Sequence, residues 1–390
     1  MPGGAEARVI DRDAPARVFF PCTGLGRERR GFEAFTRECS VAMAAFQTVE
    51  MTVFGGGGDL LPDERAVWNM PRSGTAARVI AQMLGRDAYY VEQASFFAAF
   101  ATHLALGKPD LVYFADLSLG NACWHWRRLT GQRFRLLYYN GGPTTQPFTR
   151  CDVVQQVSPE HLASARIRGE PAERQFLLPH GVDIVRAFHQ VMPDVRARCR
   201  AELGIPPGRP VIVSVGALNN SHKRMDHVID GVAAMPSRPH LALIGAETPE
   251  TPAVRAHAAE RLADRCTIRT LPRDAVQRAY LAADAFVLAS LVEGFGLAQV
   301  EALAAGLPCV AHDTGTTRYV LGPHGIIGDL TIAGTLTSLL ERALTAGPSD
   351  AEARHAHAYA NFSWDVLAGR YADAFVECAG GRVPSFATVA

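Results

Sequence analysis

The sequence lacks a net charge, because 39 Lys and Arg balance 39 Asp and Glu over 390 residues. Without a strong positive field, neither a nucleic-acid binder nor constitutive attachment to anionic lipid is expected. Long hydrophobic runs are also missing, since no uninterrupted apolar stretch approaches the roughly 20 residues of a membrane-spanning helix. The N-terminus has no apolar signal-peptide core. We therefore expect a soluble, cytoplasmic protein without an integral membrane segment.

Paired cysteine motifs are absent as well. None of the eight cysteines belongs to a Cys-x-x-Cys pair, and several lie in apolar runs, as Cys309 does in Leu307-Pro-Cys-Val-Ala311. This pattern favours buried, reduced thiols over a disulfide framework or a zinc site. Because no group of His, Cys and Asp has the spacing of zinc ligands, we expect no bound metal and no cofactor.

Short apolar runs alternate with helix-period segments, after a loose leader over residues 1–16 that is rich in Ala, Pro and charge. Buried strands separated by helices are typical of parallel sheets with helices on both faces, so the predicted fold class is α/β. The predicted strands are Arg17-Val-Phe-Phe20, Leu111-Val-Tyr-Phe114, Phe134-Arg-Leu-Leu-Tyr-Tyr139, Val211-Ile-Val-Ser-Val215, Leu241-Ala-Leu-Ile244 and Ala285-Phe-Val-Leu288.

One pattern occurs twice in the chain. The first predicted strand leads through Gly24 and Gly26 into the basic Arg27-Glu-Arg-Arg30 and then a helix. The fourth leads through Gly216 to Lys223 and a second helix. A strand, a glycine-containing turn and a helix begin a doubly wound domain. The repetition therefore predicts two Rossmann-like domains in tandem.

The domain boundaries follow from these starts. We place the N-terminal domain at residues 1–185 and the C-terminal domain at residues 186–362. The last segment, residues 363–390, contains a predicted helix that Ser363 caps and that ends near Cys378.

The segment Glu293-Gly-Phe-Gly-Leu-Ala-Gln-Val-Glu301 follows the last predicted strand. Its glycines let the backbone approach a ligand closely, because glycine has no Cβ. The helix that begins at Leu297 turns its free N–H groups and positive dipole end toward the same ligand. Carboxylates stand on both sides of these amides. The segment therefore fits a sugar nucleotide, with amides for the diphosphate and carboxylates for the sugar and ribose hydroxyls.

This Glu-x7-Glu segment, continued by Ala302-Leu-Ala-Ala-Gly-Leu-Pro308, closely resembles the retaining family 4 glycosyltransferases of the GT-B fold. The similarity extends to Val215-Gly-Ala-Leu218 with Lys223, to Pro179-His-Gly-Val-Asp183 and to Phe362-Ser-Trp364. It implies two Rossmann-like domains that face a deep interdomain cleft. The first would bind the acceptor and the second the nucleotide-sugar donor, and the C-terminal helix would cross back to the first.

The resemblance also assigns roles to single residues. Lys223 would pair with the donor diphosphate, Glu301 would hold the ribose hydroxyls, and Glu293 would address the transferred sugar. Leu271 and Arg273 lie where the family backbone meets the base. The other donor-binding residues that it implies are Gly216, Gly294, Phe295, Gly296 and Leu297.

Two positions depart from the family pattern. The family has a basic residue after the glycine of the first C-terminal strand, where this chain has Ala217; Arg224, Arg27 and Arg30 are the candidates to supply that charge. The family often has a His that faces the donor sugar where this chain has Asn140. Asn offers a hydrogen-bond donor and an acceptor but carries no proton. The exchange therefore affects sugar selectivity more than chemistry.

Two features of the N-terminal half leave alternatives open. The loop with Gly24, Gly26 and Arg27 either contacts the diphosphate or an anionic acceptor, or forms only a tight turn. It has neither the form of an NTPase phosphate-binding loop nor the full dinucleotide fingerprint. Asp116, at the end of a strand, either meets the acceptor or caps the following helix.

We therefore expect a retaining, metal-independent glycosyltransferase. It would move a hexose or N-acetylhexosamine from a nucleotide-sugar, UDP-linked by default, to an acceptor hydroxyl, with Glu293, Lys223, Asn140 and Asp116 as catalytic residues. The neutral charge favours a soluble small acceptor, such as an aminocyclitol or natural product, over lipid-linked or polysaccharide acceptors of the cell envelope. A GT-B sugar-nucleotide epimerase and a non-catalytic sugar-nucleotide binder are the alternatives, and a homodimer is an open expectation.

Overall fold

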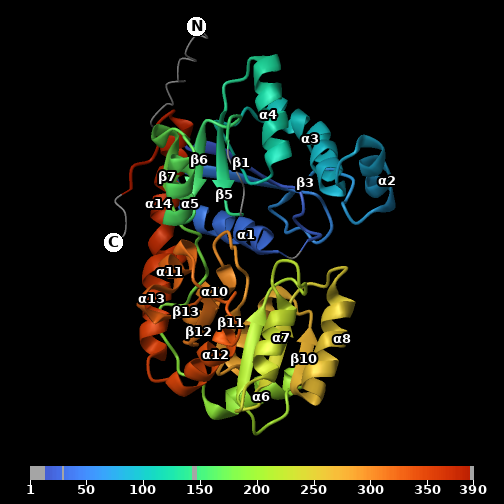
Figure 1. Cartoon of the computed structure of the whole chain (residues 1–390). Helices are drawn as coiled ribbons and strands as arrows, with labels where there is room; N and C mark the ends of the chain where they lie inside the picture. The colour runs from blue at the N-terminus through green and yellow to red at the C-terminus, as the bar shows by residue number, and fades with distance from the viewer. Residues whose placement is uncertain (1–13, 29, 143–146, 387–390) are drawn as a thin grey trace. The chain divides into compact units, whose positions relative to one another are not determined.

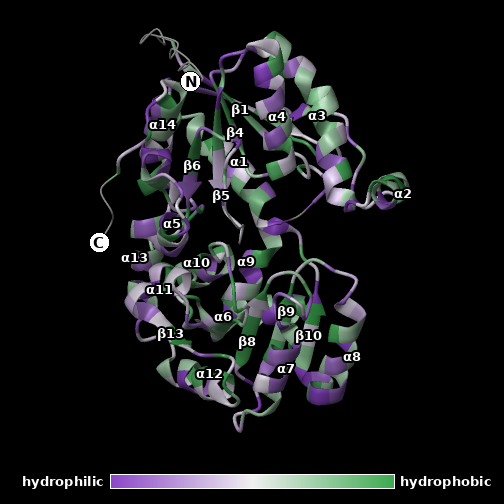
Figure 2. Ribbon diagram, turned by 45° about the horizontal axis from the view of Figure 1, so that its top comes forward, coloured by the Kyte–Doolittle hydropathy of each residue, from purple (hydrophilic) through white to green (hydrophobic). Residues whose placement is uncertain are grey.

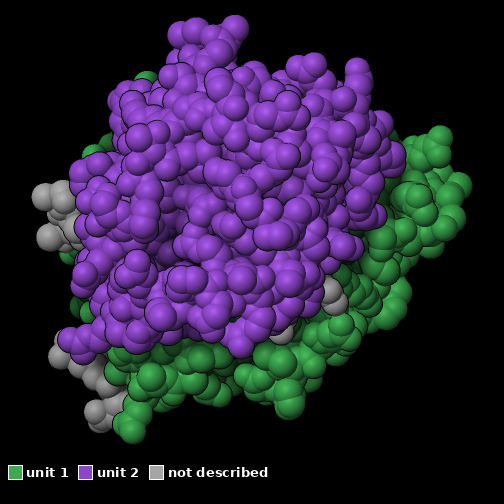
Figure 3. Space-filling model, turned by 90° about the horizontal axis from the view of Figure 1, so that it is seen from below, with its two compact units in different colours: residues 1–181, 367–390 green, residues 182–366 purple. Residues whose placement is uncertain are grey.

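The structure is a computed structural model that describes residues 14–28, 30–142 and 147–386. Most of the predicted leader, residues 1–13, lies outside these ranges. The chain divides into two compact units, which Figure 3 colours separately. Unit 1 comprises residues 1–181 and 367–390, and unit 2 comprises residues 182–366. Among the described residues, no helix is both long enough and apolar enough to span a bilayer.

Unit 1 contains a parallel sheet with the strand order β3-β2-β1-β4-β5-β6-β7 (Figure 1). Its strands are β1 (Ala16–Cys22), β2 (Val49–Gly55), β3 (Arg65–Ala66), β4 (Leu111–Phe114), β5 (Arg135–Asn140), β6 (Val153–Gln156) and β7 (Gln175–Leu177). Its helices are α1 (Gly31–Met43), α2 (Thr75–Leu84), α3 (Ala88–Gly107), α4 (Leu117–Thr130), α5 (Pro159–Ile167), the short 3-10 helix η1 (Ala172–Arg174) and most of α14 (Trp364–Ala379).

Successive strand residues of unit 1 face two different helical layers, because side chains alternate along a strand. Phe19 and Val112 belong to the core that includes residues of α3 and α4. Their neighbours Phe20 and Tyr113 belong to an aromatic cluster with α1 and α14, in which the ring centroids of Tyr113 and Phe375 are 5.0 Å apart. The sheet is therefore covered on both faces, which explains its nearly continuous apolar strands.

Unit 2 repeats this architecture with the parallel order β10-β9-β8-β11-β12-β13. Its strands are β8 (Val211–Val215), β9 (His240–Ile244), β10 (Cys266–Arg269), β11 (Ala285–Leu288), β12 (Cys309–His312) and β13 (Gly325–Gly328). Its helices are α6 (Pro193–Leu203), α7 (Met225–Ala233), α8 (Thr251–Leu262), α9 (Arg273–Ala282), α10 (Leu297–Ala304), α11 (Gly315–Leu321), α12 (Thr335–Ala346) and α13 (Ala351–Phe362), with the short 3-10 helices η2 (Ala263–Arg265) and η3 (Gly322–His324).

The core of unit 2 lies between its sheet and the layer of α7, α8 and α12. Leu241 and Leu243 of β9 pack into it together with Val228 of α7, Val254 of α8 and Leu340 of α12. In Figure 2, β8 carries the green of hydrophobic residues, whereas α8 mixes purple and green. Buried parallel strands and amphipathic covering helices are what the sequence pattern predicts.

The predicted fold class is confirmed, since both units are parallel-sheet Rossmann-like domains. Each predicted strand coincides with an observed strand to within two residues at either end. The prediction of buried thiols also holds: all eight cysteines are free, and only Cys266 is partly exposed.

One local prediction is wrong. Ser363 directly precedes α14, but its hydroxyl is buried and forms no hydrogen bond within the described residues. The two residues before it end α13, so the chain here is a junction between two helices. Ser363 is instead held by its backbone, through the bridge with Val182.

Candidate functional site

The strand order identifies the same special place in both units. In each sheet the order reverses beside the first strand, between β1 and β4 in unit 1 and between β8 and β11 in unit 2. Ligands of doubly wound domains bind beyond the carboxyl ends of the strands at such a switch point. The loops that follow these four strands are therefore where a site is expected.

At the switch point of unit 2, Lys223 and Glu293 meet. Lys223 lies in the loop after β8 and Glu293 in the loop after β11, and the ammonium forms an ion pair with the carboxylate. Their side chains are only 15% and 12% exposed. The stem of Lys223 passes close to Gly216, where an added Cβ would lie 3.1 Å from the lysine Cε. Two predicted donor-site residues are thus in direct contact.

Helix α10 begins beside this pair. Gly296 is its N-cap residue with φ of 90°, a left-handed conformation that glycine adopts without steric cost. Phe295 is buried against the ring of Phe362, and Leu297 is the first helical residue. The first-turn amides of the helix therefore start next to Gly294, at the same edge of the sheet.

Glu301 projects from the next turn of α10 and is held by two residues of α9. Its carboxylate forms an ion pair with Arg273 and accepts a hydrogen bond of 2.7 Å from the hydroxyl of Tyr280. Burial, and then the neighbouring carboxylate, raise the pKa of Tyr280, which keeps it a donor. Sequence reasoning missed Tyr280, although its spacing of seven from Arg273 puts both on one helix face. Leu271 lies just before α9 and is partly buried.

The three arginines considered as replacements for the missing charge at Ala217 all have partners. Arg224 directs Nη1 to the backbone oxygens of Ala289, at 3.4 Å, and Leu330, at 3.3 Å. It thereby ties the start of α7 to the loops after β11 and β13. In unit 1, Arg27 bonds to Asn69 and Arg30 forms an ion pair with Glu33. Which of them acts on the donor stays a prediction.

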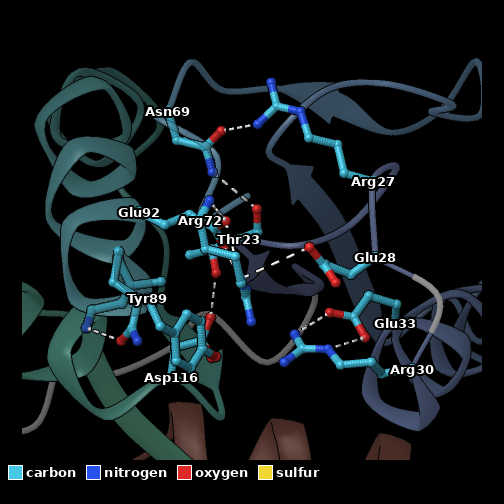
Figure 4. A network of polar contacts seen from close by, with 12 residues as sticks. Thr23, Arg27, Glu28, Arg30, Glu33, Asn69, Arg72, Tyr89, Glu92 and Asp116 are labelled. Carbon is cyan, nitrogen blue, oxygen red and sulfur yellow. Dashed lines mark hydrogen bonds and ion pairs between the residues drawn. The ribbon is translucent and has the colours of Figure 1, made fainter. Parts of the chain in front are cut away.

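At the switch point of unit 1, Asp116 lies opposite Thr23 (Figure 4). The Thr23 hydroxyl donates to the Asp116 carboxylate at 2.9 Å, and the Tyr89 hydroxyl donates to its other oxygen. Asp116 takes the N-cap position of α4 but makes no side-chain cap bond, so the alternative of a helix cap is wrong. Burial raises the pKa of this carboxyl, although both hydrogen bonds oppose the rise.

An arginine holds the tyrosine that donates to this carboxylate. The guanidinium of Arg72 lies 3.8 Å from the centre of the Tyr89 ring and is paired with the buried Glu92 (Figure 4). On the glycine loop, a Cβ on Gly24 would lie 2.6 Å from Oε1 of Glu33. Close packing thus explains this glycine, while Gly26 has the positive φ of a tight turn, 87°. The contacts of Arg72 with Glu92 and Tyr89 fix the Tyr89 ring beside the carboxyl end of β4.

A pocket of about 360 Å³ opens next to Asp116, entirely within unit 1. Its walls combine tyrosine rings with groups that donate or accept hydrogen bonds. Gln93, one of them, accepts from the backbone N–H groups of Ser118 and Leu119 and so covers the start of α4. The pocket is lined by Arg86, Asp87, Tyr89, Tyr90, Gln93, Ala115, Asp116, Leu117, Ser118 and Tyr138.

Asn140 ends β5 at the same edge of the unit 1 sheet. It is buried, with 2% exposure, and its Nδ2 donates to Oε1 of Gln156 at 2.8 Å. Sequence reasoning selected Asn140 from the family pattern but did not foresee this partner.

Comparison with known proteins bears on this arrangement. Residues 195–358, within unit 2, match the family described as Glycosyl transferases group 1. The chain is 30% identical over 236 residues to a D-inositol 3-phosphate glycosyltransferase of Xylanimonas cellulosilytica, covering 56% of this chain and 54% of that protein. It therefore matches only about half the length of that relative.

Solved structures resemble the chain over most of its length. A sucrose-phosphate synthase from Thermosynechococcus elongatus superimposes with a TM-score of 0.74 at 20% identity, covering 92% of this chain and 98% of the other. Anabaena Alr3699/HepE, solved in complex with UDP-glucose, gives 0.71 at 16% identity, covering 91% and 98%. These likenesses concern the fold and agree with the predicted GT-B class.

Proposed function

We propose that the chain is a retaining glycosyltransferase, because residues 195–358 match the family described as Glycosyl transferases group 1. It would use a nucleotide-sugar as donor, UDP-linked by default, and an acceptor hydroxyl. The observation that carries the proposal is the meeting of Lys223 and Glu293 at the switch point of unit 2, beside the start of α10. A cation and helix amides at one edge suit a diphosphate.

The donor would lie along this edge. In this proposal Lys223 and the first amides of α10 bind the diphosphate, and Glu301 holds the ribose hydroxyls. Support for the ribose role comes from Arg273 and Tyr280, which keep the Glu301 carboxylate in one orientation. Diphosphate binding would take Lys223 from Glu293, and the freed carboxylate would then be available to the sugar.

The chemistry requires stabilisation of the leaving group. The acceptor oxygen forms a bond to the anomeric carbon while the bond from that carbon to the diphosphate breaks. The acceptor proton passes to the leaving phosphate oxygen on the same face, so the anomeric configuration is retained. The ammonium and helix amides offset the negative charge that develops on the diphosphate. The carboxylates of unit 2 thus orient hydroxyls and need not transfer protons.

We place the acceptor in unit 1. The pocket beside Asp116 offers tyrosine rings for the apolar face of a ring polyol and a carboxylate for its hydroxyls. The relative in Xylanimonas is named for a small phosphorylated polyol. We therefore favour a small polyhydroxylated acceptor, and cytoplasmic action on a soluble molecule remains part of the proposal.

The first experiment is a thermal-unfolding panel of nucleotide-sugars, because a ligand that binds the native state raises the midpoint by mass action. The stabilising donor is then incubated with candidate polyols while nucleotide diphosphate release and the product's anomeric configuration are measured. Release that depends on acceptor, with retention, supports the proposal. Sugar interconversion without acceptor would instead indicate an epimerase, and binding without turnover a non-catalytic binder.

Variants test the site itself. Lys223→Ala and Glu293→Ala should each lower kcat/KM by about a hundredfold or more, the usual cost of losing one group that stabilises the transition state. Both should retain the fold, by circular dichroism. Full activity in both variants would refute the assignment of the donor site.

A further inference from the structure

Three amide side chains form a chain of hydrogen bonds across neighbouring strands of unit 1. Asn140 of β5 faces Gln156 of β6 in the sheet register, and its Nδ2 donates to the Gln156 Oε1 at 2.8 Å. Gln156 Nε2 donates to Oε1 of Gln175 in β7 at 2.7 Å. Gln175 Nε2 in turn donates to the backbone oxygen of Pro171 at 3.3 Å. We call these three side chains the amide relay.

The relay has a fixed direction because of its last member. A backbone oxygen such as that of Pro171 can only accept a hydrogen bond, so Gln175 must turn its NH2 group to it. The Gln175 oxygen then faces Gln156 and forces the Gln156 NH2 toward it. The Gln156 oxygen in turn faces Asn140 and requires the Asn140 NH2. Reversing any one amide would place two oxygens, or two NH2 groups, against each other.

One atom is left over at the open end. Oδ1 of Asn140 is buried and has no hydrogen-bond partner within the described residues. A buried acceptor without a partner is costly, and such atoms in native proteins call for an explanation. Asn140 is the last residue of β5, at the carboxyl edge where ligands of this fold bind. All three relay side chains are at most 5% exposed, so water does not readily disturb their order.

We propose that Gln156 and Gln175 are positioning residues that make Asn140 present a carbonyl oxygen, never an NH2 group, to the bound substrate. The inference rests on the proposed function. Asn140 then accepts a hydrogen bond from a hydroxyl of a sugar or polyol substrate. It selects against a substrate that lacks this hydroxyl or carries an anionic oxygen there. Without the relay, the Asn140 amide could rotate by 180° and present either its carbonyl oxygen to a hydroxyl or its NH2 group to an anionic oxygen.

The test compares four forms of the full chain: the unmodified protein, Asn140→Ala, Gln175→Leu and Gln175→Glu. Gln175→Leu removes the acceptor that orients Gln156. Gln175→Glu is the matched control, because burial favours its neutral carboxyl, whose carbonyl oxygen accepts from Gln156 while its O–H donates to the backbone oxygen of Pro171. Should Gln175→Leu fail to fold, Gln156→Met breaks the relay one step nearer to Asn140.

The first arm measures dissociation constants, by calorimetry, for UDP, UDP-glucose and the monodeoxy analogue at each glucose hydroxyl. The unmodified protein and Gln175→Glu should bind one analogue about tenfold or more weaker than UDP-glucose, since a lost hydrogen bond leaves Oδ1 unsatisfied. Asn140→Ala and Gln175→Leu should bind that analogue and UDP-glucose alike. This result assigns the hydroxyl to the donor sugar.

The second arm places the hydroxyl on the acceptor. With UDP-glucose as donor and D-inositol 3-phosphate as acceptor, the ratio of transfer to hydrolysis should fall about tenfold in Asn140→Ala and Gln175→Leu but not in Gln175→Glu. The inference is overturned if Asn140→Ala and Gln175→Leu behave like Gln175→Glu in both arms. Failure of the unmodified protein to bind UDP and UDP-glucose would count against the proposed UDP donor instead, and so the two failures are distinct.

Discussion

The ion pair between Lys223 and Glu293 predicts that replacing Glu293 changes UDP affinity and the rate of sugar transfer in opposite directions. In the structure the ammonium that would bind the donor diphosphate is already held by a carboxylate. UDP must therefore displace Glu293 from Lys223 before it can use the cation. Replacing Glu293 by Gln removes this competition and should tighten UDP binding. The same change should lower transfer, because the transferred sugar loses its carboxylate.

The size of the effect follows from burial. Exposed ion pairs contribute about 0–1 kcal/mol, whereas breaking a fully buried pair costs about 3–5 kcal/mol. At 15% and 12% exposure the pair lies between these limits, and we take about 1–2 kcal/mol. Glu293→Gln should therefore bind UDP about five- to thirtyfold more tightly. Its thermal midpoint should fall by a few degrees without ligand, since Lys223 is left without its anion.

Calorimetric titration of UDP into four proteins checks this. They are the unmodified chain, Glu293→Gln, Lys223→Met and the double variant. Once Lys223 is gone, Glu293→Gln should add no further affinity, which gives a coupling energy of about 1–2 kcal/mol in the double-mutant cycle. Glu247→Gln is the control, because Glu247 pairs with Arg255 at the exposed surface of unit 2. Equal UDP affinities for the unmodified chain and Glu293→Gln would refute the reasoning.

Three further predictions concern other parts of the molecule. Tyr280→Phe should lower kcat/KM about tenfold by releasing one oxygen of Glu301, with less loss than Glu301→Ala; equal losses would contradict a merely positioning role. Gly245→Ala should destabilise unit 2 by more than about 2 kcal/mol in urea unfolding, because its Cβ would lie 1.6 Å from the backbone oxygen of Gly216; an unchanged midpoint would contradict the packing. Burial raises the pKa of Asp116, so the folded state binds more protons than the unfolded state above the ordinary value of about 4. The free energy of unfolding should then fall as pH rises through that window, and the fall should be absent in Asp116→Asn.

Much of the fold could be predicted from sequence because it rests on short-range patterns. Each apolar run between helical segments became a parallel strand, and the repeated strand, glycine turn and helix correctly marked the start of each sheet. The prediction that Ser363 caps the last helix failed, because a serine before a helix caps it only when its hydroxyl accepts a hydrogen bond from a free backbone amide. Here α13 continues up to Ser363, and the hydroxyl is buried without a partner in the described chain.

The side-chain contacts within the candidate site could not be predicted from the sequence alone. Lys223 and Glu293 were chosen for separate roles, and nothing in their spacing indicated that they pair with each other. Tyr280, Gln156 and Gln175 carry no motif, because their importance comes from which atom they orient. Such residues are found only when the strands are ordered and the hydrogen-bond donors and acceptors are counted.

The same topology gives the two units different chemistry at their switch points. In unit 2 the loops after β8 and β11 bring an ammonium to the start of a helix, so the edge favours an anion once Glu293 is displaced. In unit 1 the corresponding loops bring Thr23 to the buried carboxylate of Asp116, and the neighbouring strand ends on Asn140, whose Oδ1 has no hydrogen-bond partner among the residues that the structure describes. These acceptor atoms attract hydroxyls and disfavour an anionic oxygen placed directly against them. The charge of Arg30 is offset by its ion pair with Glu33 and therefore does little to reverse this preference. The division of labour that we propose, a diphosphate at unit 2 and hydroxyl groups at unit 1, therefore follows from the hydrogen-bonding groups that each edge offers to a ligand.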